Sequence, residues 1–222
     1  MDQRILIIGA SGGIGSALVE TYRSAGDDVV GLSRKYDGLE VTSEASVVEN
    51  LGQLSGPFDR IIVATGALEI GPYTPEKTIK SIDPEAMLAQ FKLNTIGPAL
   101  ILKHSLALLP RDRPSVFAAL SARVGSIGDN RIGGWTSYRT AKAALNQVIR
   151  TAAIELTRTH KQSICVALHP GTVETKFTEK YVGRHPAVPA AKAAANLRHV
   201  IEGLGPNDSG QFFDWAGQPI PW

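Results

Sequence analysis

The chain has 222 residues, of which 43% are hydrophobic and 20% are charged, and its formal net charge is +2. This is the balance of an ordinary globular protein, and so small a net charge excludes a strongly basic surface for nucleic acid or an acidic tail. The length suits one domain with a substantial core, so we expect residues 1–222 to fold as a single unit.

Targeting and redox signals favour a cytoplasmic protein. The apolar run that follows the first four residues ends at glycines, which makes it too short for the apolar region of a signal peptide. No stretch of about 18 apolar residues is present, so we expect neither a transmembrane helix nor a membrane partner. The single cysteine, Cys165, excludes an internal disulfide framework and fits a reducing compartment.

Short apolar runs alternate with longer segments of helical periodicity along the whole chain. The runs change little between apolar and polar positions, as strands covered on both faces do. Strands are expected at residues 5–8, 29–32, 39–41, 60–64, 115–120, 163–168 and 211–213, and helices at residues 14–25, 43–54, 84–109, 137–159 and 189–204. This order predicts an α/β domain with a doubly wound, parallel sheet of about seven strands flanked by helices.

Local signals define two helix starts and one short connection. Asp83 is expected to cap a helix that has Pro84 at its first position, and Thr42 or Ser43 is expected to cap the helix before it. The connection formed by residues 33–38 is too short to hold a helix, which is unusual for a doubly wound sheet.

A glycine-rich turn, Gly-Ala-Ser-Gly-Gly-Ile-Gly, follows the first strand directly and opens the first helix. Its glycines Gly9, Gly13 and Gly15 permit a tight turn and let the backbone approach a pyrophosphate, at which the free N–H groups of the helix start are aimed. An ordinary glycine-rich turn would have the same composition. Its position at the first strand-to-helix junction favours a dinucleotide site, to which Ser11 and Ile14 also contribute.

The end of the second strand indicates which dinucleotide is bound. A protein that prefers NAD places an Asp or Glu there to accept from the ribose 2′-hydroxyl, whereas this chain has Ser33, Arg34 and Lys35. Arg34 can bind a 2′-phosphate in a charge-assisted, forked geometry, and a carboxylate would repel that phosphate. We therefore expect NADP(H) in preference to NAD(H). The alternative is that both cations are solvated loop charges.

Tyr138 and Lys142 stand four residues apart and so share one face of the helix expected there. Reduction of a carbonyl needs a proton for the developing alkoxide, and oxidation of an alcohol needs a base. A tyrosine with a pKa of about 10 is a poor base near neutrality, but a nearby ammonium would lower that pKa. Two unrelated helix residues could share this spacing. In a chain with a dinucleotide loop, however, the pair predicts an oxidoreductase.

Four motifs in order make the chain similar to the classical short-chain dehydrogenases/reductases, and the similarity covers essentially the whole chain. The motifs are the glycine turn, Asn94 within Leu-Asn-Thr, Tyr138-x-x-x-Lys142, and His-Pro-Gly-Thr-Val at residues 169–173. A narrower resemblance, to the C-factor and sniffer-like carbonyl reductase subgroup, rests on residues 75–77, 94–98, 121–127 and 222.

The resemblance implies a Rossmann domain that interconverts a small carbonyl compound and its alcohol by hydride transfer. It implies that Tyr138 is the general acid or base and that Lys142 binds the nicotinamide ribose. It also implies that Asn94 interrupts its helix and holds a water linking Lys142 to solvent. It also implies a homodimer or homotetramer. The remaining dinucleotide contacts implied by the resemblance are Ser33, Arg34, Glu40, Val41, Ala64, Thr65, Gly66, Pro170, Gly171, Val173 and Thr175.

One departure from the family pattern concerns the catalytic serine. In the family it stands three residues before a glycine, and counting back from Gly125 gives Ala122. We expect the adjacent Ser121 to serve in its place, with Ser126 as the alternative. Because successive strand residues point to opposite faces, Ser121 needs a twist or bulge to reach the site. Without a substituting serine, the enzyme would rely on Tyr138 alone to polarise the carbonyl.

Two other functions are alternatives to an oxidoreductase. A weakly active signalling or interaction protein could retain the C-factor-like fold, and loss of the serine favours it. A nucleotide-sugar epimerase would carry a larger C-terminal substrate domain. The five histidines lack ligand-like spacing, so no metal site is expected. Residues 181–189 stand where the family has a substrate lid, although they also suit a plain surface connection.

Overall fold

The structure of the protein, a computed structural model, describes residues 3–175 and 187–222, and its centre is a parallel β-sheet. The strands lie in the order β2 (Asp28–Leu32), β1 (Arg4–Ile8), β3 (Arg60–Val63), β4 (Ser115–Leu120), β5 (Ser163–His169) and β8 (Phe212–Asp214). A separate parallel pair consists of β6 (Val173–Glu174) and β7 (Val188–Pro189). Because β2 and β3 lie on opposite sides of β1, the sheet is doubly wound, and such sheets bind ligands at the carboxyl ends of the strands beside this point.

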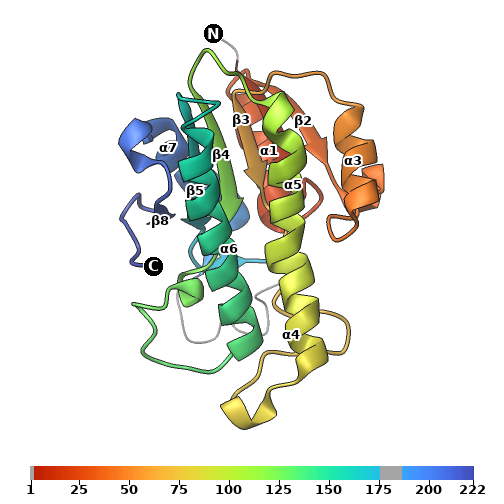
Figure 1. The fold of residues 1–222 in the computed structure, drawn as a ribbon, viewed down its shortest axis with the longest axis vertical. Helices are drawn as coiled ribbons and strands as arrows, with labels where there is room; N and C mark the ends of the chain where they lie inside the picture. Colours follow the sequence, from red (N-terminus) through yellow and green to blue (C-terminus); the bar gives the residue numbers. More distant parts are fainter. Residues whose placement is uncertain (1–2, 176–186) are drawn as a thin grey trace.

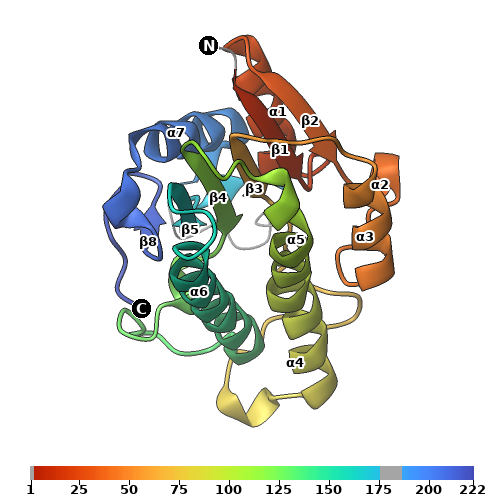
Figure 2. The ribbon, with the colours of Figure 1, turned by 45° about the horizontal axis from the view of Figure 1, so that its top comes forward.

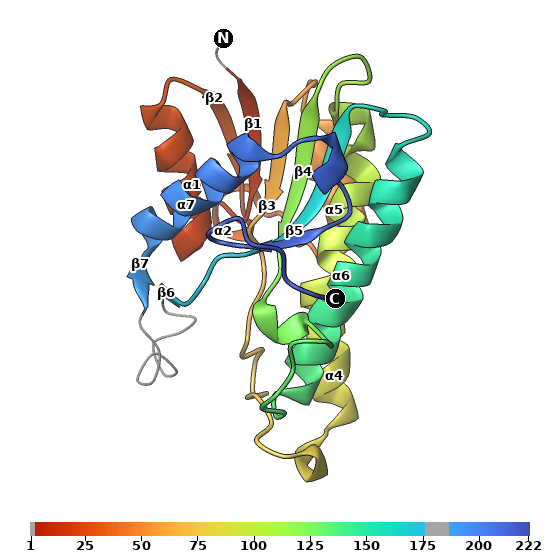
Figure 3. The same ribbon diagram turned by 90° about the vertical axis from the view of Figure 1, so that its left-hand side faces the viewer.

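Helices cover both faces of the sheet (Figure 1). On one face α1 (Gly13–Ser24) packs against α7 (Ala190–Gly203), as Figure 3 shows. The other face carries α3 (Glu44–Gly52), α5 (Gly97–Ser105) and α6 (Thr136–Leu156). α4 (Pro84–Phe91) extends beyond the carboxyl ends of the strands and packs against α6, and the two helices lie side by side in Figure 2.

Side chains of the central strands alternate between two apolar cores. Ile5 and Ile7 of β1 belong to the core that includes residues of α1 and α7, whereas Leu6 and Ile8 belong to the core under α3, α5 and α6. Successive strand residues point to opposite faces, so a strand covered on both faces must be apolar at every position. This requirement explains the unbroken apolar runs of the sequence.

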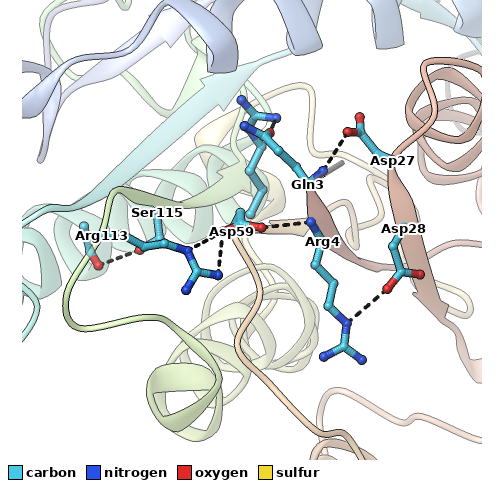
Figure 4. Close-up of polar contacts among 9 residues, drawn as sticks. Gln3, Arg4, Asp27, Asp28, Asp59, Arg113 and Ser115 are labelled. Carbon is cyan, nitrogen blue, oxygen red and sulfur yellow. Dashed lines mark hydrogen bonds and ion pairs between the residues drawn. The ribbon is translucent and has the colours of Figure 1, made fainter. Parts of the chain in front are cut away.

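Charged side chains join the amino ends of the strands, at the edge opposite to the carboxyl ends (Figure 4). The Asp59 carboxylate accepts hydrogen bonds from the backbone N–H of Arg4, at 2.9 Å, and from Arg113 Nε, at 3.0 Å. Arg4 Nε also lies 3.2 Å from the carboxylate of Asp28. These contacts link the starts of β1, β2 and β3 to the segment that precedes β4.

The central sheet has six strands among the described residues rather than the seven expected. The difference is residues 39–41, which form no strand. Their apolar members Leu39 and Val41 are buried in the core under α3 and α5. They are therefore as buried as strand residues, but they make no strand pairing in the described sheet. An apolar run can be buried by packing alone, which is why the periodicity misled the strand prediction.

The expectation that residues 33–38 hold no helix was also wrong. They contain the one-turn helix α2 (Arg34–Asp37). The Ser33 hydroxyl caps this turn by accepting from the N–H of Tyr36, and the Asp37 carboxylate accepts in return from the N–H of Ser33, at 2.7 Å. A turn held by such reciprocal caps needs only a few residues.

The helix expected at residues 84–109 is interrupted around Asn94, as the resemblance implied. It begins at α4, continues as a π-helical turn (Lys92–Ile96), and resumes as α5, with a 3₁₀ turn (Leu106–Leu108) after it. Asp83 caps α4 as predicted, accepting from the N–H groups of Glu85 and Ala86. Single π turns occur frequently at functional sites, and this one contains Asn94.

Candidate active site

Tyr138 and Lys142 share one face of α6, as their spacing predicted, and both are buried. Tyr138 is 7% exposed and Lys142 is 2% exposed, and the Lys142 ammonium nitrogen lies 5.9 Å from the centre of the Tyr138 ring. The ammonium donates a hydrogen bond to the carbonyl oxygen of Leu120, at 2.9 Å. Leu120 is the last residue of β4, so the pair stands at the carboxyl edge of the sheet.

Asn94 reaches the same place from the π-helical turn. Its amide nitrogen donates to the carbonyl oxygen of Ala67, at 2.8 Å, and its amide oxygen accepts from the N–H of Ala67, at 3.2 Å. A Cβ atom on Gly66 would lie 2.7 Å from the Asn94 amide oxygen and 3.4 Å from the Lys142 ammonium. Asn94 and Lys142 therefore converge at Gly66, whose lack of a side chain lets them approach.

Burial shifts the pKa values of Tyr138 and Lys142 in opposite directions. It raises the pKa of the Tyr138 phenol above its ordinary range, and it lowers the pKa of Lys142 to about 7. Both shifts favour the uncharged form of the group. The sequence predicted that a nearby ammonium lowers the pKa of Tyr138, whereas in this structure desolvation of the buried phenol raises it. The raised pKa keeps Tyr138 in the phenol form at neutral pH.

The glycine turn has the geometry of a phosphate site. The N–H groups of Gly9 and Ala10 both donate to the carbonyl of Leu32, and Gly9 has a φ of 91°. A Cβ atom on Gly15 would collide with the carbonyl oxygen of Gly9. No side chain of the described residues caps the start of α1, where Ser11 and Gly13 are exposed and Ile14 is half-buried. The first N–H groups of α1 thus remain available to an anion.

The predicted dinucleotide segments come together around this turn. A Cβ atom on Gly9 would lie 3.0 Å from both Ala64 and Thr65, and one on Gly13 would lie 2.7 Å from Thr175. The buried hydroxyl of Thr65 has no hydrogen-bond partner among the described residues. Val41 is buried against Gly97. A close-packed glycine cradle with an unpaired hydroxyl fits a dinucleotide phosphate and ribose.

Two carboxylates, Asp37 and Glu40, lie at the end of β2 beside Ser33 and Arg34. The Arg34 side chain is 80% exposed, and its guanidinium lies 3.5 Å from the carboxylate of Glu40. Although burial alone would raise the pKa of Glu40, hydrogen bonds from Thr42 and Arg34 outweigh it and lower that pKa. The missed carboxylate is Asp37, which accepts from the Ser33 hydroxyl at 3.1 Å. Ser33 and Asp37 are four residues apart, one more than the spacing of the usual capping signal, so that signal does not reveal the contact.

The segment after β5 also faces this edge of the sheet. Gly171 follows Pro170 with a φ of 80°, and a Cβ atom there would lie 2.9 Å from the Trp215 ring. Val173 is buried in β6. Trp215, nearly half exposed, is a neighbour of this segment that sequence reasoning missed, because its position follows from β8 lying beside β5. Most of the expected lid, residues 181–189, lies outside the described residues.

The two candidate serines have other hydrogen bonds. The Ser121 hydroxyl donates to the amide oxygen of Asn146, at 2.6 Å, on the buried face of α6. The Ser126 hydroxyl donates to the carbonyl of Pro221 and accepts from the N–H of Asp129. Each hydroxyl therefore fastens the loop after β4 to a neighbouring segment.

Two further polar residues support the site and were not predicted. Gln90 is buried, and its amide oxygen accepts from Asn94, at 2.6 Å. Glu76 is buried, and its carboxylate accepts from both the N–H and the hydroxyl of Ser137, beside Tyr138. Neither contact has a local sequence signal, since both residues lie in other segments of the chain.

Among the described residues, no helix is long and apolar enough to cross a membrane.

Solved structures share this fold over nearly their whole length. The carbonyl reductase Sniffer of D. melanogaster superposes with a TM-score of 0.80 at 20% identity, over 100% of both chains. A protein of Burkholderia multivorans, solved with bound NADP, gives 0.83 at 24% identity, again over 100% of both. The NADPH-bound carbonyl reductase from chicken fatty liver gives 0.80 at 21% identity, over 100% of this chain and 94% of that one. At these identities the likeness shows the fold.

Sequence comparison identifies the family. The chain is 29% identical to 1-hydroxy-2-glutathionyl-2-methyl-3-butene dehydrogenase of a Rhodococcus species, over 98% of this chain and 99% of that protein. It is 35% identical to C-signal of Myxococcus xanthus, over 76% of this chain and 95% of that protein. The family model for short chain dehydrogenases matches residues 3–185. The chain therefore belongs to the short-chain dehydrogenase/reductase family of NAD(P)-dependent oxidoreductases, as its motifs predicted.

Proposed function

We propose that the protein reduces a small carbonyl compound to its alcohol with NADPH, and that Tyr138 supplies the proton. The observation that carries this proposal is the convergence of Tyr138, Lys142 and Asn94 at the carboxyl end of β4. The glycine turn after β1 stands at the same edge of the sheet. A bound nicotinamide supplies the hydride, and the residues of this chain orient the reactants and donate the proton.

The protonation states favour the reductive direction. Since burial raises the pKa of Tyr138, the phenol keeps its proton at neutral pH and can donate it to a developing alkoxide. A protonated Lys142 would then stabilise the phenolate left behind. With a pKa of about 7, Lys142 can release a proton as readily as it binds one near neutrality.

The roles of the pair are separable by substitution. Tyr138→Phe keeps the buried ring but removes the hydroxyl, so turnover should fall by about a hundredfold or more while the NADPH dissociation constant stays nearly unchanged. Lys142→Ala should impair both turnover and NADPH binding, because it also removes the proposed ribose contact. Steady-state kinetics and fluorescence titration with NADPH measure the two quantities. Near-normal turnover of Tyr138→Phe would contradict the proton-donor assignment.

NADP(H) is the cofactor that we propose, and the exposed guanidinium of Arg34 at the end of β2 supports it. Binding of a 2′-phosphate would exchange the 3.5 Å contact with Glu40 for a stronger, forked one. Asp37 and Glu40 lie nearby, so the preference depends on Arg34 turning outward. Lys35 is less available, because its ammonium lies on the Tyr36 ring.

The cofactor preference should follow Arg34. NADPH should bind more tightly than NADH to the unmutated protein. Arg34→Ala should raise the NADPH dissociation constant by about tenfold and so remove most of the difference. Lys35→Ala is the matched control and should have the smaller effect. Dissociation constants for both cofactors check this, and equal constants in the unmutated protein would refute the preference.

The hydrogen bonds of Ser121 and Ser126 favour the alternative in which no serine of this loop polarises the carbonyl. We therefore propose that Tyr138 acts without a partner hydroxyl at Ala122. Ala122→Ser should then raise turnover by about tenfold, because a donor aimed at a developing oxyanion stabilises it before the reaction begins. Kinetics on a common aldehyde test this. A large loss of turnover in Ser121→Ala, with no gain in Ala122→Ser, would assign the role to Ser121.

A signalling role without turnover is the second candidate, and the 35% identity to C-signal favours it. A panel of carbonyls and alcohols, followed by nicotinamide absorbance, separates the two. Reduction of a carbonyl that is lost in Tyr138→Phe supports the enzyme. The homodimer or homotetramer and the cytoplasmic location remain predictions.

A further inference from the structure

The first turn of α6, the helix that carries Tyr138 and Lys142, is held by a carboxylate from a loop distant in sequence. Glu76 lies in the connection between β3 and α4 and is 7% exposed. The Ser137 N–H lies 3.3 Å from each of its carboxylate oxygens, and the Ser137 hydroxyl donates to one of them. Ser137 is the second residue of α6, and Tyr138 is the third. The contact thus acts on the residue next to the proposed proton donor.

A carboxylate suits this place for electrostatic reasons. The start of a helix carries unpaired N–H groups and a partial positive charge, which stabilise a negative group there. A buried carboxylate needs such partners, since its desolvation is otherwise costly. The N-cap residue of α6 is Trp135, whose indole is only a hydrogen-bond donor and so cannot accept from these N–H groups. Glu76 therefore serves α6 as a cap supplied by another segment.

The backbone of Glu76 holds the turn that leads into α6. Its carbonyl oxygen accepts from the N–H of Trp135, at 2.6 Å. Trp135 has a φ of 52°, and a non-glycine residue keeps this left-handed conformation only where its surroundings enforce it. Main chain and side chain of Glu76 together fix the direction in which α6 begins.

The residue on the other side of Tyr138 is fastened as well. The guanidinium of Arg139 donates to the carbonyl oxygens of Gly134, at 2.8 Å, Gly133, at 3.1 Å, and Val124, at 3.2 Å. The loop that carries Glu76 also carries Ala67, whose backbone holds Asn94. One connection thereby sets the position of Asn94 relative to the start of α6.

We propose that Glu76 is a positioning residue for Tyr138, acting through Ser137 and the first turn of α6. This inference rests on the function proposed above. It assigns to Glu76 no contact with substrate or cofactor: its effect is on where the phenol lies when the proton is transferred. A displacement of about 1 Å at a reacting group can cost about a hundredfold in rate, so loss of the cap should reduce turnover rather than cofactor binding.

Kinetics of four variants test the proposal, at a temperature well below the melting point of each. Glu76→Ala should lower kcat by about tenfold to a hundredfold, with the NADPH dissociation constant changed less than about twofold. Glu76→Gln keeps an acceptor oxygen for Ser137 and should recover most of the loss. Ser137→Ala should lower kcat in the same direction but by less, because the backbone N–H remains. Glu85→Gln, which removes an exposed carboxylate from the first turn of α4, is the matched control.

The outcomes separate the inference from the proposed function. Equal kcat in Glu76→Ala and Glu85→Gln would overturn the positioning role and leave the function standing. Parallel loss of kcat and NADPH affinity would also overturn it, since that pattern indicates general disruption of the fold. If Glu76→Ala does not fold, unchanged kcat in both Glu76→Gln and Ser137→Ala would overturn the positioning role instead. If the unmutated protein reduces no carbonyl, both the function and the positioning role fail.

Discussion

The site depends on one hydrogen bond, from the buried ammonium of Lys142 to the carbonyl oxygen of Leu120. It fixes α6 against the end of β4, and because Tyr138 stands one turn earlier on the same face, it also fixes the phenol. Asn94 and the same ammonium both approach Gly66, where a Cβ atom would crowd the Asn94 amide oxygen. A parallel sheet brings the ends of β1, β3 and β4 to a common edge, so the dinucleotide turn and the proton-transfer pair become neighbours.

Burial is also the source of the chemistry that we propose. Burial raises the pKa of Tyr138, so the phenol keeps its proton. It lowers the pKa of Lys142 to about 7, so the ammonium loses its proton more readily. In such surroundings, charge that develops on the substrate oxygen is poorly screened, and each aimed donor has a large effect. A missing hydroxyl at Ala122 should therefore lower the rate of the proposed reaction. The same rate should depend on the position of the phenol, which the contacts of Ser137 and Arg139 fix from both sides.

Sequence alone predicted what local pattern determines. The five long apolar runs became strands, the glycine turn and the Tyr138–Lys142 pair fell at the predicted junctions, and Asp83 caps its helix. What failed depends on partners distant in sequence. Residues 39–41 are buried by packing without a ladder. The helix interruption at Asn94 was implied by the family resemblance, but the hydrogen bonds between Asn94 and Ala67, 27 residues away, have no local signal. Glu76 contacts Ser137, 61 residues further along the chain, and this contact has no periodic signal. The role of Ser121, whose hydroxyl donates to Asn146, stays a prediction. The sign of the Tyr138 shift required knowing that both groups are buried.

The most direct test of this account is the ionisation of Lys142 in the protein itself. NMR of protein labelled with ¹³C at the ε position of lysine, with Lys142→Met to assign the resonance, follows one ammonium through a pH titration. Because the buried ammonium is desolvated, the account predicts a lysine that titrates with a pKa of about 7. Titration of Lys142 with the ordinary pKa of about 10.4 would show that the group is solvated, and would contradict the buried Tyr138–Lys142 pair on which the proposed reaction depends.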